Sequence, residues 1–127
     1  MKVARETSSL YPLCPTLYGL SISFKWRYIP LIRRGLKTET RRLRRPRLRV
    51  GGIYSLRVGR RLLPDRVRVL RIYSQRLGEV TEEDARREGF KSLTEFRRAW
   101  IDIYQSWDDD QRIWVVEFRY LGERFKD

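Results

Sequence analysis

The chain contains no histidine, no asparagine and a single cysteine, Cys14. One cysteine cannot form an intramolecular disulfide, so nothing indicates an oxidising compartment. The lack of histidine argues against a structural zinc site, a zinc-hydroxide hydrolase, and any Ser-His or Cys-His mechanism. Catalysis would have to use lysine, threonine, serine, tyrosine, aspartate or glutamate. We therefore expect neither a metal nor a cofactor.

Long apolar runs are also missing. No stretch approaches the eighteen or so residues of a membrane span, and Pro12 and Pro15 interrupt the only apolar patch near the N-terminus, so the apolar region of a signal peptide does not form. These absences predict a cytoplasmic protein without a membrane partner. The lack of asparagine fits a thermophile, although arginine richness can also reflect codon usage.

The length of 127 residues predicts one domain with a real hydrophobic core. We place an N-terminal extension at 1–16, the domain at 17–122 and a short tail at 123–127. The sequence leaves the role of the extension and the oligomeric state open.

Acidic residues are rare in the middle of the chain. The net charge is +13, and residues 25–76 hold 18 cations and only two acids, Glu39 and Asp65, which is a net +16 for that segment. Such a positive block attracts polyanions, and the planar guanidinium group suits phosphate. We predict that the loop 43–49 and the cations before it bind nucleic acid. The predicted binding residues are Arg33, Arg34, Arg41, Arg42, Arg44, Arg45, Arg47 and Arg49.

The segment 35–42, Gly-Leu-Lys-Thr-Glu-Thr-Arg-Arg, combines a helix breaker with an amine, hydroxyls, a carboxylate and guanidinium groups. Gly35 stands where a helix C-cap is expected, so Lys37 should lie in the exit from a helix. The residues that follow have the β-branched character of a strand start. Alternation along a strand would place Thr40 and Arg42 on one face, with Glu39 and Arg41 on the other.

Hydrophobic periodicity predicts the remaining elements. A half-buried strand is expected at 17–24, and 53–58 and 66–73 look like an antiparallel pair joined by 59–65, with 75–80 as a possible extension of the sheet. Helices are expected at 26–34, 82–88 and 93–106, and a last strand at 112–120. The apolar stripe of the third helix includes Trp100, which we assign mainly to the core. Together these elements predict an α+β fold in which a small curved sheet or barrel is plugged by helices.

Five separated elements of the sequence together resemble an ASCH domain over about 20–120. They are Phe24, the string formed by Ile32, Gly35, Lys37, Thr38, Thr40 and Arg42, the turn glycine Gly51, the element Ala85, Glu88, Gly89 and Phe90, and the closing pair Val115 and Phe118. The resemblance implies a PUA-like small β-barrel with flanking α-helices, in a superfamily associated with RNA and modified nucleosides. Two residues depart from the usual pattern: Gly52 replaces an aspartate, and Glu39 an apolar or neutral residue.

One branch of this family hydrolyses N4-acetylcytidine, and its catalytic lysine, threonine and glutamate would fall on Lys37, Thr40 and Glu88. The chemistry would be plausible without a metal. Surrounding arginines and partial burial would lower the pKa of Lys37 and make a neutral base available, Thr40 would supply the hydroxyl, and Glu88 would protonate the leaving group. Alternatively, Glu39 keeps Lys37 charged and the cleft only binds phosphate.

The function predicted from the sequence is therefore an RNA- or nucleoside-binding ASCH domain with a cleft lined by lysine, threonine and glutamate and a strongly basic surface. A metal-independent amidohydrolase acting on an acylated pyrimidine nucleoside such as N4-acetylcytidine is the alternative. A ribonuclease, as ascribed to some family members, or a coactivator-like protein-interaction module are further readings.

Overall fold

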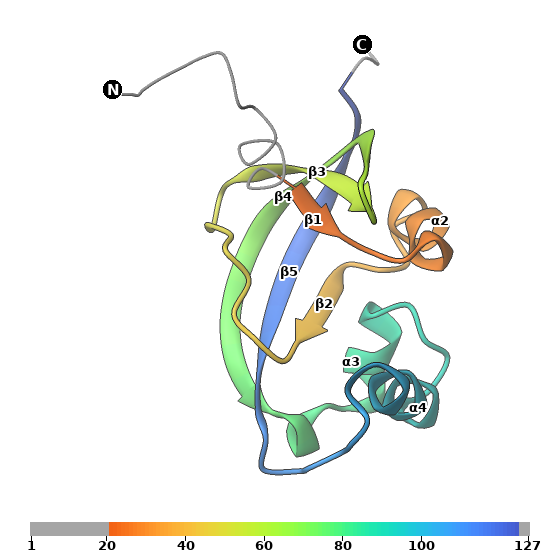
Figure 1. Cartoon of the computed structure of the whole chain (residues 1–127), viewed down its shortest axis with the longest axis vertical. Coiled ribbons are helices and arrows are strands. Elements are labelled where there is room, and N and C mark those ends of the chain that lie inside the picture. Colours follow the sequence, from red (N-terminus) through yellow and green to blue (C-terminus); the bar gives the residue numbers. More distant parts are fainter. Residues whose placement is uncertain (1–20, 125–127) are drawn as a thin grey trace.

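The computed structural model describes residues 21–124 and consists of one mixed five-stranded sheet with helices beside it (Figure 1). The extension at 1–16 and the end of the tail lie outside the described residues. In chain order the elements are β1 (Ser21–Ser23), η1 (Trp26–Tyr28), α2 (Ile29–Arg33), β2 (Glu39–Arg42), β3 (Ile53–Val58), β4 (Arg61–Arg76), η2 (Leu77–Glu79), α3 (Glu82–Arg87), α4 (Leu93–Tyr104) and β5 (Arg112–Glu123).

The strand order is β1-β3-β4-β5-β2. The pairing of β1 with β3 is parallel, and the other three pairings are antiparallel. The long strands β4 and β5 form the centre of the sheet, and their register shifts twice, between Arg66 and Val67 and between Val69 and Arg71. Such irregularities bend a sheet and increase its twist. The curved sheet in Figure 1 follows from these two positions.

The predicted α+β class is correct, but the predicted closed barrel is wrong because β1 and β2 remain at opposite edges of the sheet. A side chain joins these edges instead of a strand ladder: Nη2 of Arg42 on β2 donates to the backbone oxygen of Ser23 on β1 at 2.7 Å. The Arg42 guanidinium group thus links the edges, and no backbone hydrogen bond joins β1 to β2 within residues 21–124. This open seam borders the candidate site described below.

Two hydrophobic clusters hold the fold. The larger lies within the curved sheet and is built by alternate residues of several strands, among them Ile22, Leu56, Val67, Val69 and Phe118. The second packs α3 and α4 against the first residues of β5 and includes Phe96, Trp100 and Ile113. Burying such side chains stabilises the fold by roughly 1.5–3 kcal/mol each relative to exposure. The two clusters fix the helices against the sheet.

Local sequence signals explain where the helices begin. The hydroxyls of Thr81 and Ser92 cap α3 and α4 by accepting from the backbone N–H groups of Asp84 and Glu95, at 3.0 and 3.2 Å. In Figure 1 the helices lie beside β2, with α2 toward β1 and with α3 and α4 toward the opposite end of the sheet. This arrangement brings the end of α3 close to the segment that follows α2.

Two predicted boundaries need correction. The segment 59–65 is not a connection, because β4 already begins at Arg61. Proline disfavours the interior of a sheet, but Pro64 lies opposite the point where the pairing of β3 with β4 shifts between Ser55 and Arg57, so no regular ladder bond is lost there. The expected helix at 26–34 is divided into the turn η1 and the short helix α2, which carries its proline in the first turn.

Candidate functional site

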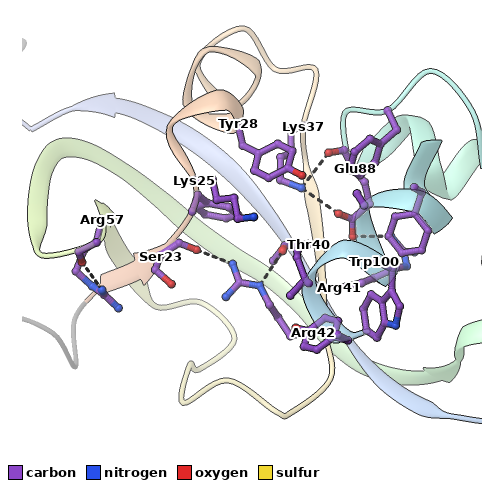
Figure 2. Close-up of a pocket in the computed structure, with 17 residues that line it drawn as sticks. Ser23, Lys25, Tyr28, Lys37, Thr40, Arg41, Arg42, Arg57, Glu88 and Trp100 are labelled. Carbon is purple, nitrogen blue, oxygen red and sulfur yellow. Dashed lines mark hydrogen bonds and ion pairs between the residues drawn. The ribbon is translucent and has the colours of Figure 1, made fainter. Parts of the chain in front are cut away.

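A cavity of about 420 Å³ opens between β2, the end of β1, the end of α3 and one face of α4 (Figure 2). This volume falls within the range of small-molecule sites, about 300–1,000 Å³. Lys37, Thr40 and Glu88 all line the cavity. The structure thus places the three residues predicted to be catalytic around one space, although they come from a loop, a strand and a helix end.

Lys37 is placed by the exit of α2. Gly35 adopts a positive φ of 74°, which an L side chain rarely tolerates, and the chain turns sharply so that the N–H of Lys37 donates to Leu31 O at 3.1 Å. The ammonium group then points inward (Figure 2). Its Nζ donates to Glu39 O at 3.1 Å, Glu88 O at 2.9 Å and Glu88 Oε1 at 3.0 Å.

These three acceptors satisfy the three donors of an ammonium ion. Burial nevertheless lowers the pKa of Lys37, against the carboxylate of Glu88, which raises it; the charges of Arg42 and Arg41 lower it further. The predicted direction agrees, but burial rather than the neighbouring arginines is the main cause. Lys37 therefore loses its proton at a lower pH than an exposed lysine does.

Glu88 ends α3 as its C-cap, and the positive φ of 99° at Gly89 turns the chain away. The two carboxylate oxygens of Glu88 have different partners. Oε1 accepts a hydrogen bond from Lys37 Nζ, and Oε2 accepts one from Arg41 Nη1 at 3.2 Å. The carboxylate is thus held by two cations, only one of which can give up its proton.

Arg41 lies on the opposite face of β2 from Thr40 and forms a buried ionic network. It donates to Glu39 Oε1 at 2.9 Å and to Gln75 Oε1 at 2.8 Å, and its Nη2 lies 3.3 Å from Asp84 Oδ1. Burial disfavours its charge, but the carboxylates around it raise the pKa of Arg41 above its ordinary value. The alternative in which Glu39 neutralises Lys37 is therefore wrong: the Glu39 carboxylate pairs with Arg41, and Glu88 is the anion beside Lys37.

Thr40 and Arg42 share the other face of β2, as the alternation predicts. The hydroxyl of Thr40 is buried and accepts from Arg42 Nε at 3.0 Å, which leaves its own proton to be donated elsewhere. Arg42 also donates to Ser23 O, and its guanidinium lies 5.1 Å from the centre of the Phe24 ring. Burial lowers the pKa of Arg42. The guanidinium group thus spans the seam between the sheet edges.

Aromatic rings form much of the cavity wall, although none of them was predicted from the sequence to line the site. The ammonium of Lys37 lies 4.8 Å from the centre of the Tyr28 ring and 5.7 Å from that of Phe24. Across the cavity, Trp100 and Tyr104 of α4 have ring centres 4.3 Å apart. Trp100 is both a core residue and a wall residue. The apolar stripe of α4 predicted burial but not which part of that stripe faces a cavity.

The eight arginines predicted to bind nucleic acid divide into groups. Arg33 forms a bidentate ion pair with Asp65 at 2.7 and 3.0 Å, and Arg41 is buried in the network above. Arg42 lines the cavity. The other five are exposed and form no ion pair among the described residues: Arg34, Arg44, Arg45, Arg47 and Arg49. Arg45 stacks 5.1 Å from the ring centre of Trp114. The loop 43–49 therefore keeps its charges on the surface.

Within residues 21–124, no group of three or more potential metal-ligating side chains lies together. The longest helix in that range has 12 residues, and none is long and apolar enough to cross a membrane.

No family model and no curated protein matches the chain. Solved structures do match in fold. The ASCH domain from Lactobacillus crispatus JV V101 has a TM-score of 0.63 at 18% identity, over 74% of this chain and 70% of that one. A variant of ZmASCH from Zymomonas mobilis has a TM-score of 0.58 at 18% identity, over 78% and 66%. The hypothetical protein PH0355 has a TM-score of 0.60 at 21% identity, over 78% and 95%.

Proposed function

The chain has the ASCH-domain fold, and from that premise we propose that its cavity binds the base of a modified pyrimidine nucleoside. The observation that carries this proposal is the buried pair of Lys37 and Glu88 in an aromatic-walled cavity that also contains Thr40. A paired charge of each sign, buried beside apolar rings, supplies the few placed polar groups that small-molecule sites use for orientation.

The shape and chemistry of the cavity favour a flat heteroaromatic ring. Tyr28, Phe24, Trp100 and Tyr104 present ring surfaces on which a base can stack, which contributes roughly 1–3 kcal/mol per base. At the polar end, Glu88 can accept from an exocyclic amino group. Discrimination by such buried polar groups is strong, because a ligand without the matching group leaves them unpaired.

Hydrolysis of an acylated amino group is the second candidate, and the direct contact of Lys37 with Glu88 favours it. Transfer of one proton from the ammonium to the carboxylate gives a neutral amine and a carboxylic acid without separating charge. Amine and acid would then be available together, as acid–base catalysis of amide cleavage requires.

The bonding changes would proceed as follows. The oxygen of Thr40 attacks the acyl carbon while its proton passes to Lys37, and Arg42 stabilises the oxyanion. The bond between the acyl carbon and N4 breaks, and Glu88 protonates the departing amino group. A second proton transfer from Lys37 to Glu88 restores the neutral amine and the acid; water then attacks the acyl-threonine ester and gives a proton to Lys37, while Glu88 protonates the departing threonine oxygen. The products are the pyrimidine nucleoside and acetate.

Acetate release and calorimetric titration test the two candidates separately. The wild-type protein is incubated with N4-acetylcytidine, and free acetate and cytidine are quantified together, so that a true hydrolysis gives equal amounts of both. Binding is measured with N4-acetylcytidine on Thr40→Val, which lacks the nucleophile. Binding without release supports the binding function and removes the amidohydrolase candidate. Failure to bind N4-acetylcytidine or any other pyrimidine nucleoside of a modified panel overturns the proposal.

A further inference from the structure

One end of the cavity gathers positive charge around the end of β1. Arg57 lies opposite Ser23 in the parallel pairing of β1 with β3, and its Nε donates to Ser21 Oγ at 3.0 Å. Arg42 reaches the backbone oxygen of Ser23 from the other edge of the sheet, and Lys25 follows two positions later. Figure 2 shows Lys25, Arg42 and Arg57 around Ser23. Three cations from separate parts of the chain thus lie around one strand end.

The cations at this end differ from those at the other end in how they are paired. Lys37 and Arg41 have carboxylate partners, and Glu88 is the one acid among the described residues that line the cavity. Within residues 21–124, neither Lys25 nor Arg42 forms an ion pair, and the hydrogen bonds of Arg42 to Thr40 and Ser23 go to neutral oxygens. A largely buried guanidinium without a carboxylate is costly unless an anion completes it.

We propose that the Lys25, Arg42 and Arg57 end of the cavity binds the phosphate of a nucleotide, so that the ligand is a phosphorylated rather than a free nucleoside. This inference rests on the proposed function, since the base occupies the Lys37, Thr40 and Glu88 end. Planar guanidinium groups match phosphate oxygens, and an exposed lysine adds a point charge at the opening.

Arg42 also sets the geometry of the two ends. Its Nε contacts Thr40 at 3.0 Å and its Nη2 contacts Ser23 O at 2.7 Å. A single guanidinium group therefore lies between the Thr40 end of the cavity and its cationic end. The lowered pKa of Arg42, caused by burial and opposed by the charges of Tyr104 and Glu88, fits a cation that lacks a counterion.

A second hollow extends from the cationic end toward the loop 43–49. It measures about 310 Å³, and Arg42 and Tyr104 line both spaces. Exposed arginines of the loop border this hollow at Arg44 and Arg45. A phosphate held at Arg42 can therefore belong either to a free nucleotide or to a nucleotide within a strand that continues over the loop. Both sources share the nucleoside phosphate, and the experiment separates them.

The test compares four ligands on Thr40→Val protein by calorimetry: N4-acetylcytidine, its 5′-monophosphate, its 3′-monophosphate, and a single-stranded tetranucleotide with one N4-acetylcytidine. Charge-assisted hydrogen bonds predict that at least one monophosphate binds about tenfold or more tightly than the nucleoside. A tetranucleotide that binds more tightly than either monophosphate identifies the polymer as the source. The reverse order identifies the free nucleotide.

Two variants locate the phosphate. Lys25→Ala and Arg57→Gln should each reduce the monophosphate advantage several-fold while leaving nucleoside binding unchanged. The matched controls Lys91→Ala and Arg119→Gln remove the same charges from exposed positions outside the cavity lining and should change neither. Equal affinity for nucleoside and monophosphates, or an advantage that survives both variants, overturns this inference while leaving the proposed function in place. If none of the four ligands binds, the proposed function fails as well.

Discussion

The Nζ atom of Lys37 lies 3.0 Å from Oε1 of Glu88, although the two residues are 51 positions apart and both side chains are buried. Isolated buried charges are costly, so each of these groups depends on the other and on further hydrogen bonds. Arg41 supplies the remaining contact to Glu88, at 3.2 Å. The pair therefore belongs both to the cavity and to the packing of the end of α3 against β2.

Replacing the base or the nucleophile tests the hydrolysis candidate. Lys37→Met and Thr40→Val keep the approximate volume of two buried side chains, and each should reduce acetate release at least about a hundredfold, the lower bound for a catalytic acid or base. Alanine would be a poorer choice, because both residues are buried.

The controls for these variants lie close in sequence. Thr38→Val changes the neighbouring threonine, which does not line the cavity, and Lys91→Met changes an exposed lysine. Both should retain full turnover. Melting temperatures check the fold: Lys37→Met leaves Glu88 with Arg41, so it should cost less than the roughly 3–5 kcal/mol of an unpaired buried charge. Residual turnover above a tenth of wild type in Lys37→Met would remove the lysine from the reaction.

The pH dependence distinguishes Glu88 from Glu39 as the partner of Lys37. Burial lowers the pKa of Lys37 below 10.5, and because the reactive pair of amine and acid holds one proton, turnover should fall as the pH rises through that lowered pKa. Glu88→Gln removes the charge that opposes this shift and should lower the pKa further. Glu39→Gln removes a carboxylate that contacts Arg41 and should leave the pKa of Lys37 nearly unchanged.

The pKa of Lys37 is measured directly by following its side-chain resonances during a pH titration. The sign can also be checked by unfolding. Between the lowered folded pKa and 10.5 the unfolded chain binds more protons, so stability should increase with pH across that window. A larger shift of the Lys37 resonance in Glu39→Gln than in Glu88→Gln would contradict the assigned pairing.

Asp65 offers a test of stability away from the cavity. Its fully buried carboxylate accepts from Arg33 and from the hydroxyl of Tyr120 at 2.7 Å, and these hydrogen bonds, that of Arg33 foremost, lower the pKa of Asp65. Tyr120→Phe should cost about 1–3 kcal/mol, because it removes one hydrogen bond to a buried charge. Denaturant unfolding at neutral pH measures this loss.

The same variant should unfold at a higher pH on acidification. A lowered carboxylate pKa contributes stability that is present above about 4 and is lost as the pH falls through the folded value, and Tyr120→Phe brings that value back toward normal. Tyr73→Phe is the control, since the Tyr73 hydroxyl has no hydrogen bond among the described residues. In wild type, burial raises the pKa of Tyr120 to about 12, so this tyrosine should ionise late in an ultraviolet titration. Equal stabilities of the two phenylalanine variants would contradict the assigned role of Tyr120.

From the exposed arginines of the loop 43–49 we expect RNA binding that weakens as the salt concentration rises. Each phosphate contact on a single strand contributes about 0.7 to the slope of log affinity against log salt. Replacing four loop arginines by alanine should flatten that slope by up to about 3. The variant carries Arg44→Ala, Arg45→Ala, Arg47→Ala and Arg49→Ala.

A quadruple control with the same change in net charge separates the loop from the overall charge. It replaces exposed arginines on α3, α4 and β5 and should retain most of the slope. The control carries Arg86→Ala, Arg98→Ala, Arg112→Ala and Arg119→Ala. Equal slopes for wild type and the loop variant would remove the loop from RNA binding.

Local sequence signals predicted the segment 35–42 well. The glycine at the end of α2, the alternation along β2 and the capping hydroxyls are decided by neighbouring residues, so Gly35, Thr40 and Ser92 could be placed without a structure. Glu88 could be predicted as a helix end, because Gly89 follows it. What could not be read locally is the partner that each polar group finds.

Long-range features depended on the bend of the sheet. Closure of a barrel requires strand tilt and register to agree around the whole sheet, and nothing local in the sequence determines whether β1 and β2 pair. The start of β4 could not be predicted, because a proline within a strand indicates a connection, and β4 tolerates Pro64 only because the register shifts in the pairing with β3. Likewise, the apolar spacing of α4 indicates a buried face, but only the packed structure shows that Trp100 and Tyr104 border a cavity.

The most direct test of the central claim is an NMR titration of Thr40→Val protein with N4-acetylcytidine, observed at the four tryptophan indole N–H signals. Trp100 lines the cavity, whereas Trp26, Trp107 and Trp114 do not. We predict a saturable shift of the Trp100 signal that exceeds those of the other three. Saturation without movement of Trp100, or no shift at millimolar ligand, would contradict base binding in this cavity.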